Sequence, residues 1–352
     1  MYKTKFKLNV VTPLFMYGGD TQRPEVRTTE FKGLIRFWWR ALKASKNIES
    51  LKKEEEAIFG GISKDSGKSK VSIQITDEKL YFGDSLRDEY KLNFRYNREK
   101  RIMEGKDAAI VYLLYSTVQK NPKKFIKQNS SFSLSLYSQD ENALKNAIAG
   151  LWCALNIGAF GTRSRRGAGS LSVKEIEGNT YGLDFTPKGS SRKDITNWLK
   201  ENKTIAANIV GAENEPCNKY SNLNDASFIV SKRSFDSWQG ALQEIGNEYM
   251  NFRIKKRKDV QLGVFGLPII HSDKSKIEAK YNKNYIRRRA SPLLIKVIKC
   301  KDGYRWLLLQ FSGDIFPEGT KLVWTGKEKE EKPRKEIIDD FWTNVKDMNN
   351  DL

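Results

Sequence analysis

The first 180 residues alternate between two kinds of hydrophobic spacing, and the order of these segments limits the folds open to the chain. Strand-like alternation covers residues 2–10, 71–76, 131–137 and 171–176. Helix-like spacing covers residues 30–44, between the first two strands, and 140–157, between the last two. The order strand, helix, strand, strand, helix, strand predicts a ferredoxin-like, RRM-like domain.

Other segments fit around this pattern less regularly. The continuous apolar run over residues 108–115 predicts one further, buried strand, and residues 80–105 are expected to be an irregular connector. Residues 178–191 are rich in Gly, Pro, Ser and Thr and predict a boundary between two domains, 1–180 and 181–352. The second half carries helical patterns and a hairpin pattern over 292–311. We therefore expect an α+β chain of two ferredoxin-like domains with insertions.

The charge of the chain points to a polyanionic partner. Lys and Arg number 63 against 43 Asp and Glu, which gives a formal net charge of +20. RNA, DNA and an acidic membrane surface all attract such a chain. No run of 18 apolar residues exists and the opening residues lack the apolar core of a signal peptide, so we expect a cytoplasmic protein without a membrane partner.

Residues 158–170 hold four glycines, three arginines and no acid, between a helical pattern and a strand pattern. Glycine permits a positive φ and close approach of another chain, and successive N–H groups in such a loop can form an anion site. Arginine adds a planar fork that fits phosphate. Tight packing alone would explain the glycines but not the arginines. The predicted RNA contacts here are Gly161, Arg163, Arg165, Arg166, Gly167 and Gly169.

Two further basic groups are candidates for the same surface. The helix over 30–44 carries a stripe of Lys32, Arg36, Arg40 and Lys43, which is either a solvated face or, beside the glycine loop, one wall of a basic groove. Arg287, Arg288 and Arg289 are adjacent and cannot share one face, so at least one points inward or to a partner.

The residues offer little for catalysis or for a metal. His271 is the only histidine and is expected to be a surface or edge residue. The three cysteines, Cys153, Cys217 and Cys300, are too far apart in sequence for a zinc-finger or redox pair. We expect no catalytic set, no metal and no cofactor, and therefore not an enzyme.

Several motifs in order resemble a known family. They are Thr12-Pro13-Leu14-Phe15, the helix Phe31-Lys32-Gly33-Leu34-Ile35-Arg36-Phe37-Trp38-Trp39-Arg40, the stretch Glu55-Glu56-Ala57-Ile58-Phe59-Gly60, the glycine-rich loop, and Arg289-Ala290-Ser291-Pro292-Leu293. Together they are similar to the RAMP superfamily of CRISPR proteins, and within it to the first subunits of the Cmr complex, the type III-B CRISPR effector. Residues 46–70 and 80–105 match none of its motifs.

This resemblance implies two ferredoxin-like domains and an RNA-binding subunit without nuclease activity of its own. It also implies a place at the end of an antiviral ribonucleoprotein, beside other Cmr subunits, the 3′ part of the guide RNA and the facing target RNA. The loop arginines, Lys32 and Arg36 match the superfamily's RNA-facing motifs. Two alternatives stay open. One is a RAMP-type endoribonuclease that processes precursor guide RNA. The other is a protein scaffold without RNA contact, which the aromatics Trp38, Trp39, Tyr96 and Trp324 would serve if they are exposed.

Overall fold

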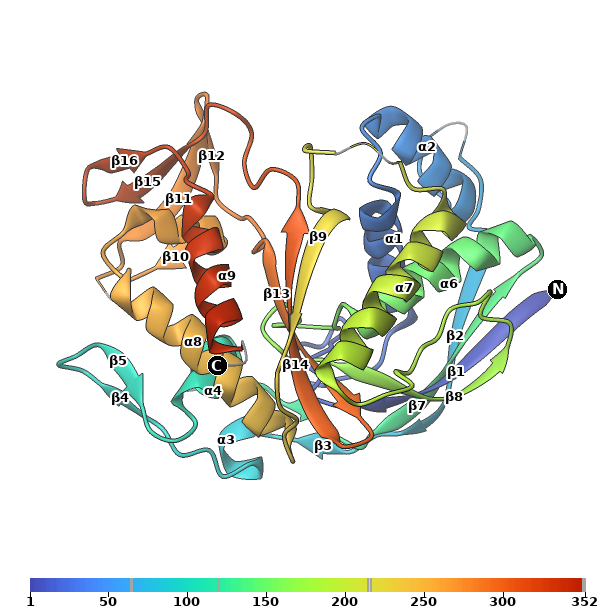
Figure 1. The fold of residues 1–352 in the computed structure, drawn as a ribbon, viewed down its shortest axis with the longest axis horizontal. Coiled ribbons are helices and arrows are strands. Elements are labelled where there is room, and N and C mark those ends of the chain that lie inside the picture. The colour runs from blue at the N-terminus through green and yellow to red at the C-terminus, as the bar shows by residue number, and fades with distance from the viewer. Residues whose placement is uncertain (64–65, 119–120, 214, 216, 272, 350–352) are drawn as a thin grey trace.

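The computed structural model describes residues 1–63, 66–118, 121–213, 215, 217–271 and 273–349. Its first half is built on a four-stranded antiparallel sheet with the strand order β2-β7-β1-β8 (Figure 1). The chain passes through this sheet as β1, α1, β2, β7, α6 and β8, which is the predicted βαββαβ order. The bounds are β1 (Tyr2–Val10), α1 (Thr28–Lys43), β2 (Val71–Lys79), β7 (Ser131–Ser138), α6 (Glu141–Asn156) and β8 (Leu171–Gly178).

Helices α1 and α6 lie against each other because one small residue lets their backbones approach. A Cβ on Gly150 would lie only 2.6 Å from the carbonyl oxygen of Ile35. The buried Trp39 indole donates a hydrogen bond of 2.7 Å to the Asn146 side chain, so the pair is fixed by a polar contact as well. The apolar faces of both helices, with Phe6 of β1, form the core of the first half.

The second half places a three-stranded antiparallel sheet, in the order β13-β14-β9, in the middle of the molecule (Figure 1). One face of this sheet shares a core with α1, α6 and α7, and the other packs against α8 and α9. Both faces are covered, which is why β13 and β14 read as continuous apolar runs. The bounds are α7 (Arg192–Val210), β9 (Asn222–Val230), α8 (Trp238–Lys255), β13 (Leu293–Cys300), β14 (Gly303–Ser312) and α9 (Glu336–Met348).

The chain is thus mixed α/β with several antiparallel sheets, but a second complete ferredoxin-like unit is not confirmed. Within the described ranges, no fourth strand joins the sheet of β13, β14 and β9. Because the core around Phe6 also contains Leu307 and Phe311, the two halves pack as one body. The division of the chain at residue 180 stays a prediction.

The remaining elements lie around these two sheets. A second layer of short strands, β10 (Ile269–Ile270), β11 (Lys276–Tyr281), β12 (Asn284–Ile286), β15 (Lys321–Thr325) and β16 (Lys329–Glu331), packs on the 3₁₀ helix η1 (Val260–Phe265). The segment 80–105 holds β3 (Phe82–Gly83), α3 (Leu86–Glu89) and the hairpin of β4 (Arg95–Asn97) and β5 (Ile102–Glu104). Strand β3 pairs with β6 (Phe125–Ile126), and none of the helices in the described ranges is long and apolar enough to cross a membrane.

The strand predicted over 108–115 is wrong, because this run forms the helices α4 (Ala108–Leu113) and α5 (Tyr115–Val118). A short apolar run has no periodicity that distinguishes a buried strand from a buried helix. Here α4 packs along α8, where a Cβ on Gly246 would come within 3.1 Å of Ala109. Helix α2 (Ile48–Phe59) contains most of the motif from Glu55 to Gly60 and ends one residue before its glycine.

Candidate nucleic-acid interface

The glycines of the loop at 158–170 are required by its fold. Gly161 and Gly169 have φ values of +74° and +68°, which side chains other than glycine rarely adopt. A Cβ on Gly169 would lie 1.8 Å from the carbonyl oxygen of Phe160, and one on Gly161 would lie 2.4 Å from that of Phe15. At Gly167, with a φ of +89°, a Cβ would meet Leu242 of α8 at 2.3 Å. Close packing therefore explains these glycines, as the packing alternative proposed.

Part of the predicted anion site is already occupied by the protein. The N–H groups of Thr162 and Gly169 donate to the carbonyls of Phe15 and Pro13, at 2.8 and 2.9 Å. The N–H of Gly161 donates to the Glu30 carboxylate at 3.1 Å. In the described part of the chain, the successive N–H groups of residues 163–165 have no protein acceptor. The open segment of the loop is therefore the one that carries the arginines.

Helix α1 lies directly beside this loop, as a basic groove requires. The ring of Phe31 is 4.6 Å from that of Phe160, and the Arg165 guanidinium lies 5.7 Å from the ring centre of Phe37. Lys32 follows Phe31 and is half-buried, and burial together with the neighbouring Arg36 lowers its pKa. The loop and the start of α1 thus form one surface.

Arg163 is the loop arginine with the fewest protein contacts. Its φ of +64° is unusual for a side-chain-bearing residue, and its Nε donates to the Ser116 hydroxyl at 2.9 Å. Burial and the neighbouring Arg166 lower its pKa. Next to Ser116, the side chain of Tyr115 is 49% exposed. A guanidinium with free terminal nitrogens beside an exposed aromatic ring can bind a phosphate and stack a base.

Arg165 points toward the segment that precedes β13. Its Nη1 donates to the carbonyl of Ser291, and its guanidinium lies 4.9 Å from the ring centre of Phe311. Burial lowers the pKa of Arg165 to about 10, and the nearby positive charges of Arg166 and Arg289 act in the same direction. One edge of this guanidinium is used within the protein.

Arg166 is held entirely by protein groups. Its Nη1 donates to the carbonyls of Arg165 and Leu293, at 3.1 and 3.2 Å. Its Nη2 donates to the Tyr249 hydroxyl at 2.7 Å and to the Phe265 carbonyl at 3.3 Å. The guanidinium also lies 4.7 Å from the ring centre of Tyr249. Arg166 therefore joins the loop to α8, η1 and β13, and its fork is already filled.

The stripe on α1 is largely neutralised by the following helix. Glu55 of α2 accepts from Arg36 Nε at 2.6 Å and also pairs with Arg40, while Glu54 pairs with Lys43 at 2.8 Å. The main-chain carbonyl of Gly60 accepts from Arg36 at 3.1 Å. The motif from Glu55 to Gly60 thus fixes the arginines of α1. The acids that pair with the stripe come from α2 and not from α1 itself.

Of the three adjacent arginines, one points inward, as predicted. Arg289 is half-buried, its Nη2 donates to the Asp314 carbonyl at 3.2 Å, and its Nε is buried without a partner. Its backbone pairs with Leu267 through hydrogen bonds of 2.8 and 3.2 Å. Arg287 and Arg288 are exposed.

Positive charge gathers in and around the loop, while the Glu30 carboxylate contacts the N–H of Gly161. Among the described residues, no carboxylate forms an ion pair with any of five arginines that lie in and around the loop. They are Arg163, Arg165, Arg166, Arg253 and Arg289. Partly buried cations without counterions favour the binding of an anion.

The chain is similar in sequence and in fold to known proteins. Residues 7–172 match the family model of the RAMP superfamily. The chain is 35% identical over 191 residues to the CRISPR system Cmr subunit Cmr1-2 of Pyrococcus furiosus, covering 50% of this chain and 97% of that protein. This chain belongs to the Cmr1 family.

Other comparisons extend over more of this Cmr1-family chain. It is 26% identical over 315 residues to the Cmr subunit Cmr1-1 of Pyrococcus furiosus, which covers 85% of this chain and 84% of that one. The crystal structure of apo Cmr1 from Pyrococcus furiosus has a TM-score of 0.65 at 24% identity, over 90% of each chain. A chain of the type III-B Cmr-beta complex bound to cognate target RNA has a TM-score of 0.59 at 15% identity, over 99% of each chain. Both structures share the fold.

The sequence of this Cmr1-family chain did not predict two residues of the surface. Arg253 of α8 donates from Nε to the Tyr112 hydroxyl at 2.9 Å and from Nη1 to the Tyr249 hydroxyl at 3.1 Å. Tyr115 lies in the run that was predicted to be a buried strand. In the sequence, Arg253 is distinguished only by its place at the start of a basic cluster. Its contact with Tyr112 could not be predicted, because the two residues are distant in sequence. Within the described ranges, no group of three or more His, Cys, Asp and Glu side chains could hold a metal ion.

A buried lysine fixes the start of the loop in this Cmr1-family structure. Lys296 of β13 is 1% exposed, and its Nζ donates to the carbonyl of Gly158 at 2.7 Å. Burial lowers its pKa from 10.5 to about 7, because the charged ammonium is poorly solvated there. The neutral amine still donates the hydrogen bond.

This lysine predicts a pH dependence of stability. Between about pH 7 and pH 10.5 the unfolded chain binds a proton at Lys296 that the folded chain lacks. The free energy of unfolding should therefore rise with pH in this window, by up to about 1.4 kcal/mol per pH unit. Urea denaturation of the wild type and of Lys296→Met at about pH 8 and about pH 9 isolates this contribution. A difference between the two proteins that does not change with pH would contradict it.

Proposed function

We propose that this chain is a non-catalytic RNA-binding subunit of a type III-B Cmr ribonucleoprotein. In this role it contacts guide RNA, in its 3′ part, and target RNA, beside other Cmr subunits, in cytoplasmic antiviral defence. The observation that carries the proposal is the group of partly buried arginines without carboxylate partners around the glycine loop. Membership of the Cmr1 family and a shared fold with a chain of an RNA-bound Cmr complex support it.

The individual residues contribute to this surface in different ways. Lys32 and Arg163 have free donors at the surface, and Arg165 has one free edge, so we infer that these three contact phosphate. Arg36 and Arg40 are held by Glu55, and Arg166 is held by four protein acceptors. These three position the surface. The contacts of Lys32, Arg163 and Arg165 are to the RNA backbone, so they do not depend on the base sequence of the RNA.

The nuclease alternative finds little support in the candidate bases. Tyr17 donates its hydroxyl to the carbonyl of Lys124, and burial raises its pKa to about 12, which disfavours a role as general base. His271 stacks on Trp324, with ring centres 4.5 Å apart, and its Nε2 is buried. Neither arrangement presents a base to an RNA 2′-hydroxyl.

The scaffold alternative loses most of the aromatics on which it depends. Trp38 and Trp39 are 1% exposed and Trp324 is 8% exposed, so all three are core residues, and only Tyr96 lies at the surface. A subunit still docks on its neighbours, but Trp38, Trp39 and Trp324 are buried and cannot form the exposed aromatic surface on which this alternative depends.

Binding of labelled single-stranded RNA to the purified chain across a salt series tests the proposal. We expect the logarithm of the association constant to fall with the logarithm of salt concentration, with a slope of about −0.7 per phosphate contacted. The RNA should remain at full length on the same gels. Shortened RNA that disappears on His271→Ala would favour the nuclease, and the absence of any RNA affinity would favour the scaffold.

A further inference from the structure

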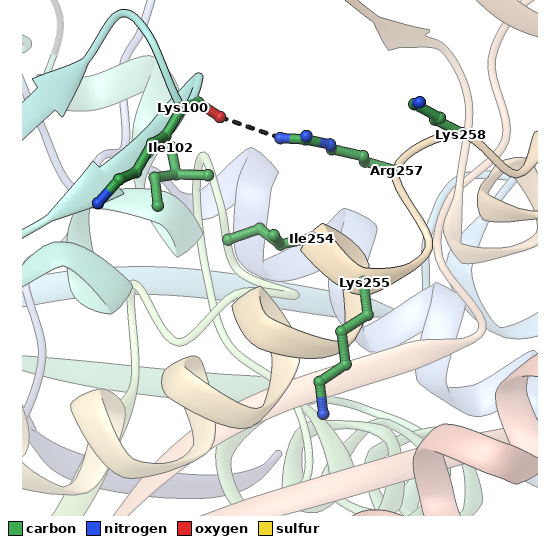
Figure 2. A pocket seen from close by; sticks show the side chains of 6 residues that line it. All are labelled: Lys100, Ile102, Ile254, Lys255, Arg257 and Lys258. Atoms are coloured by element: carbon green, nitrogen blue, oxygen red, sulfur yellow. Dashed lines mark hydrogen bonds between the residues drawn. The ribbon is translucent and has the colours of Figure 1, made fainter.

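An open hollow of about 460 Å³ lies where the end of α8 faces the β4–β5 hairpin. Figure 2 shows its lining, with Ile102 and Ile254 turned toward each other and the cationic residues around them. The main-chain carbonyl of Lys100 accepts a hydrogen bond of 2.9 Å from Arg257 Nη1, which ties the hairpin to the segment after the helix. The lining residues are Lys100, Ile102, Ile254, Lys255, Arg257 and Lys258.

The hollow is strongly cationic. The four consecutive residues 255–258 are all basic and exposed, and in the described part of the chain none of them has a carboxylate partner. Of the nearby acids, Glu104 is paired with Arg95 at 3.1 Å and with Lys100 at 3.3 Å. Asp340 lies in an adjoining hollow lined also by Lys255, and Glu99 stands on the hairpin turn. Positive charge remains in clear excess.

Stabilisation of the helix end does not account for this cluster. Cations near a helix C-terminus interact favourably with the helix dipole, but the effect falls off within the last turn. Helix α8 ends at Lys255, so Arg257 and Lys258 lie beyond it. Arg257 is used to hold the hairpin, which leaves Lys258 without a structural role.

Helix α8 connects the glycine loop to the hollow through contacts of the buried Tyr249. Arg253, one residue before Ile254, donates to the hydroxyl of Tyr249, which also accepts from Arg166 of the loop. The same helix therefore leads from the loop arginines to the hollow. On the hairpin, Tyr96 is 50% exposed and offers an aromatic face on which a base could stack. An acidic peptide would need the cations but neither the connection to the loop arginines along α8 nor the aromatic face.

We propose that this hollow is a second contact for the RNA backbone, which binds phosphates of the strand that leaves the glycine loop along α8. The inference rests on the proposed function and extends it, because it gives the segment 80–105 a role in positioning the strand. The ligand is a phosphodiester chain, and its recognition does not depend on base sequence.

The test compares two lengths of single-stranded RNA on the full chain. An oligonucleotide of about 6 nucleotides fits a single site, and one of about 20 nucleotides can reach both. The variant is Lys255→Gln/Lys258→Gln. The control is Lys193→Gln/Lys200→Gln, which removes the same charge from exposed positions on α7. Removing two phosphate contacts should lower the salt slope by about 1.4 and the affinity by roughly 10-fold at about 0.15 M salt.

We expect this loss only for the longer RNA and only in the hollow variant. Equal losses in the variant and the control would overturn the inference, because they would reflect net charge alone. An unchanged affinity in the hollow variant, while substitutions at the loop weaken binding, would overturn it and leave the proposed function standing. In that case, loss of poly-glutamate binding in the same variant, but not in the control, would identify an acidic protein as the partner. If the wild type binds neither RNA, the proposed function itself fails.

Discussion

Replacement of Lys32, Arg163 and Arg165 together by glutamine is expected to weaken the binding of single-stranded RNA by about 50-fold at about 0.15 M salt. The estimate follows from the slope of the logarithm of the association constant against the logarithm of salt concentration. This slope becomes shallower by about 2.1 when three phosphate contacts are lost. These are the cations of the loop surface with free donors. In the described part of the chain, the side chain of Arg163 donates only from Nε to Ser116, that of Arg165 donates only from Nη1 to Ser291, and that of Lys32 has no hydrogen-bond acceptor. Fluorescence anisotropy across a salt series measures both the affinity and the slope.

The control for this prediction removes three exposed lysines elsewhere, in Lys193→Gln/Lys200→Gln/Lys301→Gln. It brings the net charge down by the same amount and should cost the affinity much less. Lys32 and Arg163 make few contacts inside the protein, but Arg165 also contacts Ser291 and Phe311, so thermal unfolding of both variants is measured and RNA binding is compared at a temperature where both are folded. If the loop variant and the control bind RNA equally well, the loop is a packing element and its cations do not contact the RNA.

The elements β1 and α1 could be predicted from the sequence because each of them buries one face. The alternation over 2–10 places Phe6, Leu8 and Val10 on the buried side of β1, and the spacing over 30–44 does the same for α1. In the run at 108–115 every residue except Tyr112 and Tyr115 is buried, so the run carries no clear period, and its packing against α8 favours a helix. Periodicity is therefore clearest where the burial is one-sided, although the longer helix α6 was predicted in spite of its nearly complete burial.

The roles of the basic residues were harder to predict, because their partners are distant in sequence. The acids that hold Arg36 and Arg40 stand one helix later, at Glu55 and its neighbours. The acceptors of Arg166 stand at Tyr249, Phe265 and Leu293. Three arginines within four residues look alike in the sequence, and only the fold decides which of them faces the solvent.

The second large effect is expected on stability. Replacement of Arg166 by alanine should lower the free energy of unfolding by about 3 kcal/mol. Hydrogen bonds from a charged donor contribute about 1.5 to 3 kcal/mol, and buried acceptors left without a partner add to the loss. The carbonyls of Phe265 and Leu293 and the ring of Tyr249 would lose their contacts with the guanidinium. Relief of repulsion with Arg253 offsets part of this cost. Urea denaturation measures the net effect.

The matched variant Arg166→Lys separates charge from geometry. Lysine keeps the positive charge but cannot reach four acceptors with one ammonium group, so it should recover only part of the lost stability. If Arg166 were instead an RNA contact, Arg166→Lys would bind RNA nearly as well as the wild type, and Arg166→Ala would unfold normally and bind weakly. The expected result is the reverse: both variants lose stability, and at temperatures where they remain folded their salt slopes stay close to that of the wild type. Arg166 then maintains the shape of the loop on which Arg163 and Arg165 are presented.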